Sequence, residues 1–283
     1  MNPRFAATSW SEPTASLARA EGRLALSFRR RGEITALGDL YQQGCAKARF
    51  PKVEAGAMTC AVTLNTAGGL TGGDRIDTAV TWEDGAAATI ASQAAERAYR
   101  AIGPLPARLT TRLDIRAGAN AEWLPQETIL FDDCAIARDL RIELAPDASF
   151  TGIEQVVFGR TARGETVRRG SFRDAWRLSR GGRLVHADVL SLEGDMQARL
   201  DRAAVGQGAR AIAALVHAAP ERGDKLAELR NALGPFPLWG ASEFDGIIVA
   251  RLLAPTGADL RPMVIAALAV LRDHRPLPRV WQI

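Results

Sequence analysis

Residues 139–146 read DLRIELAP, and residues 107–116 read ARLTTRLDIR. In the first stretch Leu140, Ile142 and Leu144 alternate with polar or charged side chains, the period of a strand with one buried face. Similar short segments follow one another from about residue 17 to about residue 216, with Gly, Pro, Asp or Asn between them. The pattern predicts consecutive antiparallel strands in a mainly β fold.

Two stretches predict tight turns between such strands. Gly181 and Gly182 stand between WRLSR and RLVHADVLSL, and adjacent glycines accept the positive φ of a primed hairpin turn. EDGA at residues 83–86 follows AVTW and predicts a second hairpin of the same kind.

The hydrophobic period changes near the C-terminus. Asp224 is a candidate N-cap for a helix with Leu226, Leu229 and Leu233 on one stripe, ending at Gly234 and Pro235. Asp259 is a candidate N-cap for a second helix with the apolar face Leu260, Val264, Leu268 and Leu271, in which Pro262 is expected in the first turn. Residues 246–255, GIIVARLLAP, predict a buried strand between the two helices.

The length of 283 residues fits one large β-rich domain. Residues 1–15 are rich in Ser, Pro, Ala and Thr without periodicity, and they are expected to form a flexible tail. Because no internal repeat or low-complexity linker is visible, residues 16–283 are predicted to form a single domain.

Composition excludes several classes of function. Hydrophobic residues make up 47% and charged residues 24%, with a net charge of +4 and a pI of about 9.3, which fits a globular protein. The basic excess is Arg spread along the chain, with no basic run, so nucleic-acid binding is not expected. The longest apolar run, MVIAALAVL, is too short to cross a bilayer, and no membrane association is expected.

The cysteines indicate a reducing compartment. Cys45, Cys60 and Cys134 are far apart and odd in number, which argues against a disulfide framework. The chain shows no basic segment followed by an apolar run at its start, so a cytoplasmic location is predicted.

The glycine-rich stretch LNTAGGLTGGDRI, residues 64–76, does not match a phosphate-binding loop. Asp74, not Lys, follows Gly73, and the spacing of the glycines differs from that of the dinucleotide fingerprint. The paired glycines are expected to form turns where backbone passes close to backbone. Asp74 has two interpretations, as an acceptor for loop amides or as a carboxylate facing a polar cavity.

Two further acidic stretches invite a metal or catalytic interpretation. EWLPQETILFDDC, residues 122–134, contains Glu127, Asp132 and Asp133, and Glu154 precedes the apolar run QVVF. The residues SQAAERAYRA, 92–101, fit either a solvated strand face or a surface that admits a neighbouring chain closely. His186, His217 and His274 are isolated, and no close Cys or His pair occurs, so no tight metal site is predicted.

Catalytic signatures are missing as well, including the nucleophile elbow and the zinc-protease motif. One enzymatic alternative stays open, a β-rich hydrolase that pairs Glu127 with Asp132 or Glu154.

Five stretches in order resemble the urease accessory proteins of the UreD family, called UreH in some bacteria. They are LNTAGGLTGGDRI, SQAAERAYR, EWLPQETILFDD, IEQVVFGRTARGE and the terminal PRVWQI. Two departures are Ala91 and Ser92, where the family often has paired threonines, and Arg97, where Lys is frequent.

The resemblance implies a scaffold that is not an enzyme. It implies a fold that is a layered, helix-like stack of strands with a few α-helices. It also implies cytosolic docking on the urease structural subunits, together with the helical partner UreF and the GTPase UreG, to deliver nickel. No tightly bound cofactor is implied, only transient nickel moving through an internal polar passage, where shallow sites are needed for an ion to leave again.

The resemblance also suggests site residues. The acids in matching motifs, Asp74, Glu127 and Glu154, are the candidates to line the passage, followed by Asp132 and Asp133. Candidate partner contacts lie in the C-terminal elements, at Leu226, Leu229, Leu268 and Trp281. Trp281 is expected either as an exposed anchor or as a residue packed on its own domain. The alternative function is a generic assembly module without contact to nickel.

Overall fold

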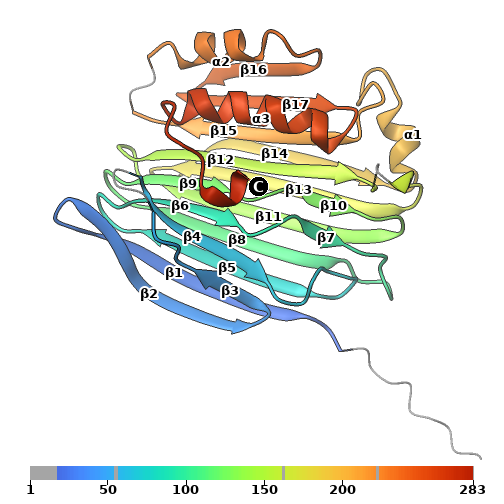
Figure 1. The fold of residues 1–283 in the computed structure, drawn as a ribbon, viewed down its shortest axis with the longest axis horizontal. Coiled ribbons are helices and arrows are strands. Elements are labelled where there is room, and N and C mark those ends of the chain that lie inside the picture. The colour runs from blue at the N-terminus through green and yellow to red at the C-terminus, as the bar shows by residue number, and fades with distance from the viewer. Residues whose placement is uncertain (1–17, 54–56, 161–162, 221–222, 283) are drawn as a thin grey trace, which may run out of the picture.

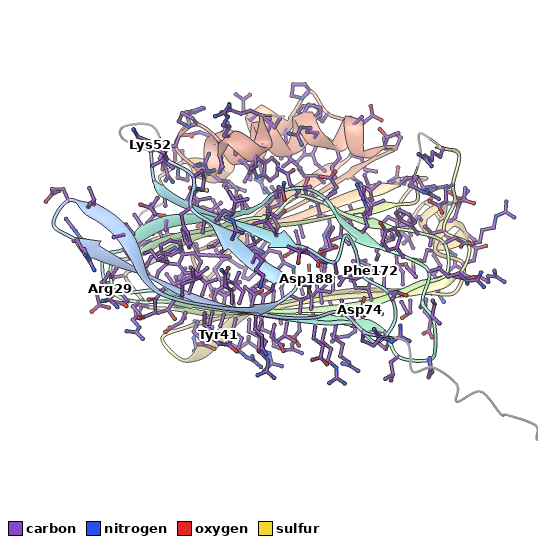
Figure 2. All side chains as sticks on the ribbon, turned by 60° about the horizontal axis from the view of Figure 1, so that its bottom comes forward. Arg29, Tyr41, Lys52, Asp74, Phe172 and Asp188 are labelled. Carbon is purple, nitrogen blue, oxygen red and sulfur yellow. The ribbon has the colours of Figure 1, made fainter. Side chains whose placement is uncertain are left out.

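The computed structural model describes residues 18–53, 57–160, 163–220 and 223–282. The predicted tail, residues 1–15, lies outside these ranges. Within them two sheets are stacked face to face, and the helices α2 (Lys225–Leu233) and α3 (Gly257–Leu271) lie on one side of the stack (Figure 1, Figure 2). The prediction of a mainly β, layered stack of strands with a few helices toward the C-terminus is confirmed.

Seven strands of the described chain form the first sheet, called sheet A, in the order β14-β13-β11-β8-β5-β1-β2. Their bounds in chain order are β1 (Glu21–Arg31), β2 (Ile34–Gly44), β5 (Arg75–Trp82), β8 (Ala107–Ile115), β11 (Cys134–Leu144), β13 (Gly170–Arg180) and β14 (Arg183–Glu193).

Ten strands of the described ranges form sheet B, in the order β16-β17-β15-β12-β9-β6-β4-β3, with β10 pairing both β12 and β7 beside this path. Their bounds are β3 (Ala46–Arg49), β4 (Thr59–Asn65), β6 (Ala87–Ser92), β7 (Glu96–Ala98), β9 (Asn120–Leu124), β10 (Thr128–Leu130), β12 (Ser149–Phe158), β15 (Ala211–Ala218), β16 (Trp239–Phe244) and β17 (Ile247–Ala254).

From β4 to β13 the chain winds as a stack of coils. It passes back and forth between the sheets, and each pass adds a parallel strand to each sheet, as in the series β5-β8-β11-β13 and the series β4-β6-β9-β12. The prediction of consecutive antiparallel strands is therefore wrong for this part. Alternation records only that one face of a strand is buried, and here that face packs on the opposite sheet whichever strand lies beside it.

Antiparallel pairs close both ends of the stack. At one end β1 pairs with β2 and β3 with β4; at the other β13 pairs with β14, and β15, β17 and β16 follow. The β13–β14 hairpin turns at Gly181 and Gly182, with φ of +56° and +79° as predicted. The turn at residues 83–86 is present, but it leads from β5 in sheet A to β6 in sheet B, so the predicted hairpin is wrong.

Three α-helices occur in the described ranges, with a short 3₁₀-helix at the end. They are α1 (Met196–Leu200), α2 (Lys225–Leu233), α3 (Gly257–Leu271) and η2 (Arg279–Trp281). Asp224 is the N-cap residue of α2, although its side chain makes no capping hydrogen bond. None of these helices is long and apolar enough to cross a lipid bilayer.

Helix α3 begins earlier than predicted. Its N-cap is Thr256, whose hydroxyl accepts a hydrogen bond from the amide of Asp259 at 3.1 Å. Asp259 therefore lies in the first turn, where a carboxylate favours the positive end of the helix dipole, and is not the cap. Because the helix starts at Gly257, Pro262 falls in the second turn.

Apolar side chains fill most of the space between the sheets. One cluster contains Phe28, Trp82 and Phe150, all fully buried. A second cluster joins the outer face of sheet B to α2 and α3 through residues such as Leu229 and Leu268.

A third cluster, at the other end of the strands, contains Leu130, Phe158 and Phe172. On β11 and β13, Arg138 and Asp174 stand between residues of the first cluster and residues of the third.

Candidate functional site

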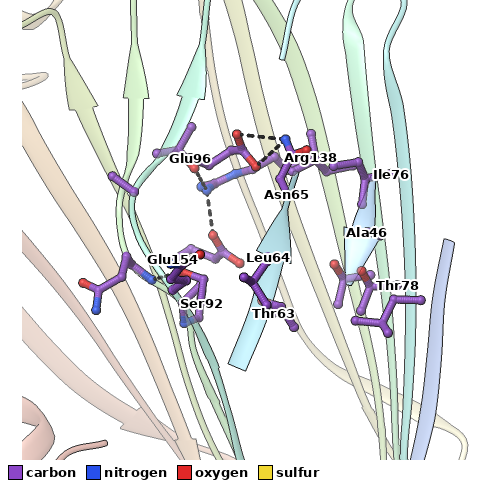
Figure 3. Close-up of a pocket in the computed structure, with 18 of the residues that line it drawn as sticks. Ala46, Thr63, Leu64, Asn65, Ile76, Thr78, Ser92, Glu96, Arg138 and Glu154 are labelled. Carbon is purple, nitrogen blue, oxygen red and sulfur yellow. Dashed lines mark hydrogen bonds and ion pairs between the residues drawn. The ribbon is translucent and has the colours of Figure 1, made fainter. Parts of the chain in front are cut away.

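A cavity of about 260 Å³ opens between the two sheets. In sheet A, one inward row pairs Val80 with Leu113, and these large side chains fill the interior. Two residues earlier the same strands carry Thr78 and Thr111, which are shorter and polar. The polar groups that line this cavity include Asn65, Glu96, Thr128, Arg138, Glu154 and Asp174 (Figure 3).

Glu96 enters the cavity from the start of β7. Its carboxylate accepts hydrogen bonds from Asn65 Nδ2 at 3.2 and 3.1 Å and from the amide of Arg97 at 3.0 Å. Burial raises the pKa of Glu96, and the hydrogen bonds from Asn65 and Arg97 oppose that rise. Glu96 is therefore a partly desolvated acid that gains from a nearby cation.

Arg138 joins two carboxylates at the floor of the cavity. Its Nε and Nη2 atoms contact Asp174 at 3.1 and 2.6 Å, and its Nη1 atom lies 2.6 Å from Glu154 Oε2 and 3.0 Å from Thr128 Oγ1. Glu154 also accepts a hydrogen bond from Trp123 Nε1 at 2.9 Å. Burial raises the pKa of Glu154, whereas the charge of Arg138 lowers it.

A second, smaller cavity lies on the other side of Arg138. Its volume is about 10 Å³, close to the minimum for one water molecule. Arg138, Glu154 and Asp174 line both cavities, and the smaller one also reaches Trp176 and the ion pair between Asp188 and Arg251. Asp188 and Arg251 are only partly buried, so the charged residues that line the two cavities include Glu96 at one end and a partly exposed ion pair at the other.

Of the five acids predicted to line a passage, the structure places one in these cavities. Glu154 lines both, whereas Asp74, Glu127, Asp132 and Asp133 line neither. The hydrolase alternative would pair Glu127 with Asp132 or Glu154, and neither Glu127 nor Asp132 lines either cavity.

Asp74 is a buried acceptor for loop amides. One carboxylate oxygen accepts from the amide of Ala20 and the other from the amide of Thr71, each at 2.8 Å. Of the two interpretations, the amide acceptor is the one that the structure shows. Asp74 thus joins the glycine-rich loop to Ala20, the residue before β1, and both of its carboxylate oxygens are used in these hydrogen bonds.

Asp132 and Asp133 hold a neighbouring loop. Asp132 accepts hydrogen bonds from the amides of Arg168 and Arg169 at 2.8 and 2.9 Å, and Asp133 pairs with Arg100 and Arg169. Asp133 has a φ of +62°, which marks a tight turn before β11. Their contacts are structural ones within the chain.

The candidate partner contacts are mostly interior residues. Leu229 and Leu268 are fully buried, and Trp281 is 2% exposed, while Leu226 is half-buried. Trp281 donates a hydrogen bond from Nε1 to the carbonyl of Leu124 at 3.0 Å. For Trp281 the structure therefore shows packing on its own domain, because its ring fills the space between the C-terminal segment and sheet B. That α2, α3 and the C-terminal segment contact a partner stays a prediction, and it now concerns the exposed surfaces of these elements.

Soft metal ligands do not converge in the described chain. Burial raises the pKa of Cys60 to about 11 and that of Cys134 to about 12, so both thiols stay protonated near neutral pH. His217 contacts Thr151, and the ring of His186 packs on Phe244. In the described ranges no group of three or more His, Cys, Asp or Glu side chains is arranged to hold a metal ion.

Sequence reasoning missed most of the charged residues in the cavities. Arg138 stands in phase with Leu140 and Ile142 on the inward face of β11, and Asp174 stands between Phe172 and Trp176 on β13. A charged residue at an apolar position of a strand is the signal that could have identified both. Glu96 belongs to the stretch SQAAERAYRA, whose spacing fits a solvated strand face or a surface that admits a neighbouring chain closely, and does not predict an acid facing a cavity.

Fold and site together define a class of protein, a solenoid-like stack of two sheets with a charged internal cavity. The match to known sequences is more specific. A family model described as the UreD urease accessory protein matches residues 20–282. The chain therefore belongs to the UreD family, as the five sequence stretches indicated.

Several relatives are similar over nearly their whole length. A urease accessory protein UreD from Methylobacterium sp. (strain 4-46) is 48% identical, covering 96% of this chain and 99% of the relative. One from Sinorhizobium medicae (strain WSM419) is 44% identical, with 95% and 99% covered. One from Chelativorans sp. (strain BNC1) is 42% identical, with 95% and 96% covered. These relatives are named as accessory proteins and not as enzymes.

Proposed function

We propose that this chain is a non-catalytic scaffold for urease maturation, which docks on apo-urease with UreF and UreG in the cytoplasm and lets nickel pass through its interior. The membership in the UreD family supports the maturation role. The observation that supports the passage is the pair of adjoining cavities between the sheets, which share the buried charged residues Arg138, Glu154 and Asp174.

The chemistry of the cavity suits transit better than storage. Carboxylates are hard ligands that bind a divalent ion together with water, and protonated thiols add no competing soft site. An ion that must leave again needs several weak sites in series. Glu96, Glu154, Asp174 and Asp188 provide such a series, each held by a neighbour within the chain.

The test is urease activation by variants that remove one charge and keep the shape. Urease subunits are co-expressed with their accessory proteins and either wild-type chain, Glu96→Gln or Glu154→Gln, and the nickel content and urea hydrolysis of the purified urease are measured. The matched control is Glu143→Gln, because Glu143 lies exposed on the opposite face of β11 from Arg138. We expect a several-fold loss of nickel for the first two variants and none for the control.

The same experiment separates the alternative function. Pull-down with UreF is measured for every variant, so that a loss of docking is not mistaken for a loss of transit. If the cavity variants bind UreF and activate urease like the wild type, the chain is an assembly module without nickel contact.

A further inference from the structure

Arg138, Glu154 and Asp174 line both cavities, and the guanidinium of Arg138 is the cationic group of the three. This group makes a fork of two contacts to the carboxylate of Asp174. It also makes one contact of 2.6 Å to Glu154 (Figure 3). The side chains of all three residues are nearly buried, with exposed fractions of 7%, 11% and 8%. Any ion that moves from one cavity to the other must pass between the same two carboxylates.

The charges in this cluster do not balance. Two carboxylates and one guanidinium leave a formal charge of −1 in a poorly solvated place, where such an excess is costly. The two carboxylates by themselves carry a formal charge of −2, which a divalent cation between them matches once the guanidinium has turned away. A monovalent ion matches only half of that charge, so the position favours divalent ions.

Arg138 has other contacts that it keeps when it leaves the carboxylates. Its Nη1 atom lies 3.0 Å from Thr128 Oγ1, a neutral acceptor, and its Cζ atom lies 5.4 Å from the centre of the Phe172 ring. A guanidinium is weakly hydrated and stacks on aromatic faces, so a short rotation leaves it partly solvated by the protein.

An independent observation lies on the other side of Arg138. Trp176 is 2% exposed and lines the smaller cavity, and its Nε1 atom has no hydrogen-bond acceptor among the described residues. An indole N–H can only donate, and a buried donor without an acceptor is costly. A single water molecule in this cavity, or one that a cation carries with it, would supply an oxygen that can accept this hydrogen bond.

We propose that Arg138 is a displaceable gate, whose guanidinium occupies at rest the site between Glu154 and Asp174 that a divalent cation, after losing most of its water, takes during passage. The proposal rests on the proposed function, since it assumes that a divalent ion enters the cavity. It assigns Arg138 a positioning role: the arginine keeps the two carboxylates occupied without holding a metal, and returns when the ion has moved on.

The gate predicts that a variant without the arginine binds a divalent ion at this site and releases it slowly. In Arg138→Gln both carboxylates lose their cation, so an ion that enters has no competitor and is retained. A side chain that merely blocks the way would give the opposite result, faster delivery without retention. The two outcomes separate displacement from steric plugging.

The experiment is equilibrium dialysis of the full chain, purified with its UreF partner, against Ni²⁺ alone. We expect Arg138→Gln to retain one additional Ni²⁺ per chain, at least about tenfold more tightly than the wild type does. The triple variant Arg138→Gln with Glu154→Gln and Asp174→Asn should lose this retention, and Glu143→Gln should match the wild type. Circular dichroism verifies that each variant is folded.

If Arg138→Gln does not fold, Asp174→Asn tests the same idea from the other side. Its cluster holds one carboxylate and one guanidinium, so a cation gains less by displacing Arg138, and nickel delivery to urease should fall without any rise in retention. Unchanged delivery by folded Asp174→Asn contradicts the gate, as does a folded Arg138→Gln that binds no more nickel than the wild type.

The passage and the gate fail in different ways. If Glu96→Gln and Glu154→Gln leave urease activation intact, the passage is wrong whatever the dialysis shows. If those variants lose activation but Arg138→Gln retains no nickel, the passage stands and the displacement of Arg138 is wrong.

Discussion

Two buried arginine–carboxylate clusters can be compared in this molecule. In the first, Arg138 serves Glu154 and Asp174 between the sheets. In the second, Arg272 and Arg275 both contact Glu122, at distances of 3.0 and 3.1 Å from Arg272 and 3.0 Å from Arg275. The first cluster has an excess of one negative charge, and the second has an excess of one positive charge.

Their surroundings differ more than their chemistry does. Glu122 is fully buried and also accepts a hydrogen bond from Thr89 Oγ1 at 2.5 Å, so its oxygens are saturated. Neither Glu122 nor Arg272 lines the two cavities. This cluster ties the C-terminal end of α3 to β9, 150 residues away in the sequence. The Glu122 cluster, which lines neither cavity, is a structural tie, whereas the proposed gate requires that the Arg138 cluster exchange its cation.

The largest effect on stability is expected from breaking the closed cluster. Glu122→Gln leaves Arg272 buried with its charge uncompensated, and removing one partner of a buried pair costs about 3–5 kcal/mol. The free energy of unfolding is measured by urea denaturation followed by circular dichroism. Glu143→Gln, on an exposed face, should change it by less than about 0.5 kcal/mol. If Glu122→Gln lowers the free energy of unfolding by less than about 1 kcal/mol, the cluster does not hold the C-terminal end of α3 to β9.

The strands could be predicted from the sequence, but their partners could not. The alternation of Leu140, Ile142 and Leu144 identified β11 correctly. The same alternation suits antiparallel and parallel neighbours, because it records burial against the opposite sheet and says nothing about hydrogen bonding at the strand edges. The resemblance to a family supplied the layered stack that the pattern alone did not.

The candidate site was predictable only in part, for a similar reason. Arg138 and Asp174 were readable as charged residues in apolar positions, and the parallel register of β11 and β13 places them directly opposite each other. Glu154, the predicted acid that does line the cavities, reaches this pair from the other sheet. Contact across the sheets depends on how the coils stack, which no local pattern contains.

An intermediate effect is expected from the C-terminal segment that the closed cluster holds in place. Trp281→Phe keeps an aromatic ring but removes the donor to the Leu124 carbonyl, leaving a buried acceptor unpaired at a cost of about 1–3 kcal/mol. The same denaturation measurement tests it. The control is Gln282→Ala, since Gln282 is exposed and should be nearly neutral. Equal effects of the two variants would contradict the role of the indole.

The smallest effect, and the one most specific to the open region, concerns pH. Burial raises the pKa of Glu96 in the folded chain above its unfolded value of about 4.3. The folded state therefore binds more protons than the unfolded state between these two pKa values, and the stability of the wild type falls as the pH rises through that window.

Glu96→Gln removes this titration while keeping the shape of the side chain. The variant should be more stable than the wild type at neutral pH, and the difference should shrink as the pH falls toward the unfolded pKa, because both side chains are then neutral. The measurement is the free energy of unfolding of both proteins from about pH 4, near the unfolded pKa of Glu, to about pH 8. An advantage for Glu96→Gln that grows at low pH would show that the carboxylate is stabilised where it lies. In that case Glu96 would gain little from a bound cation. It would then be satisfied by its neighbours in the chain, as Glu122 is in the closed cluster.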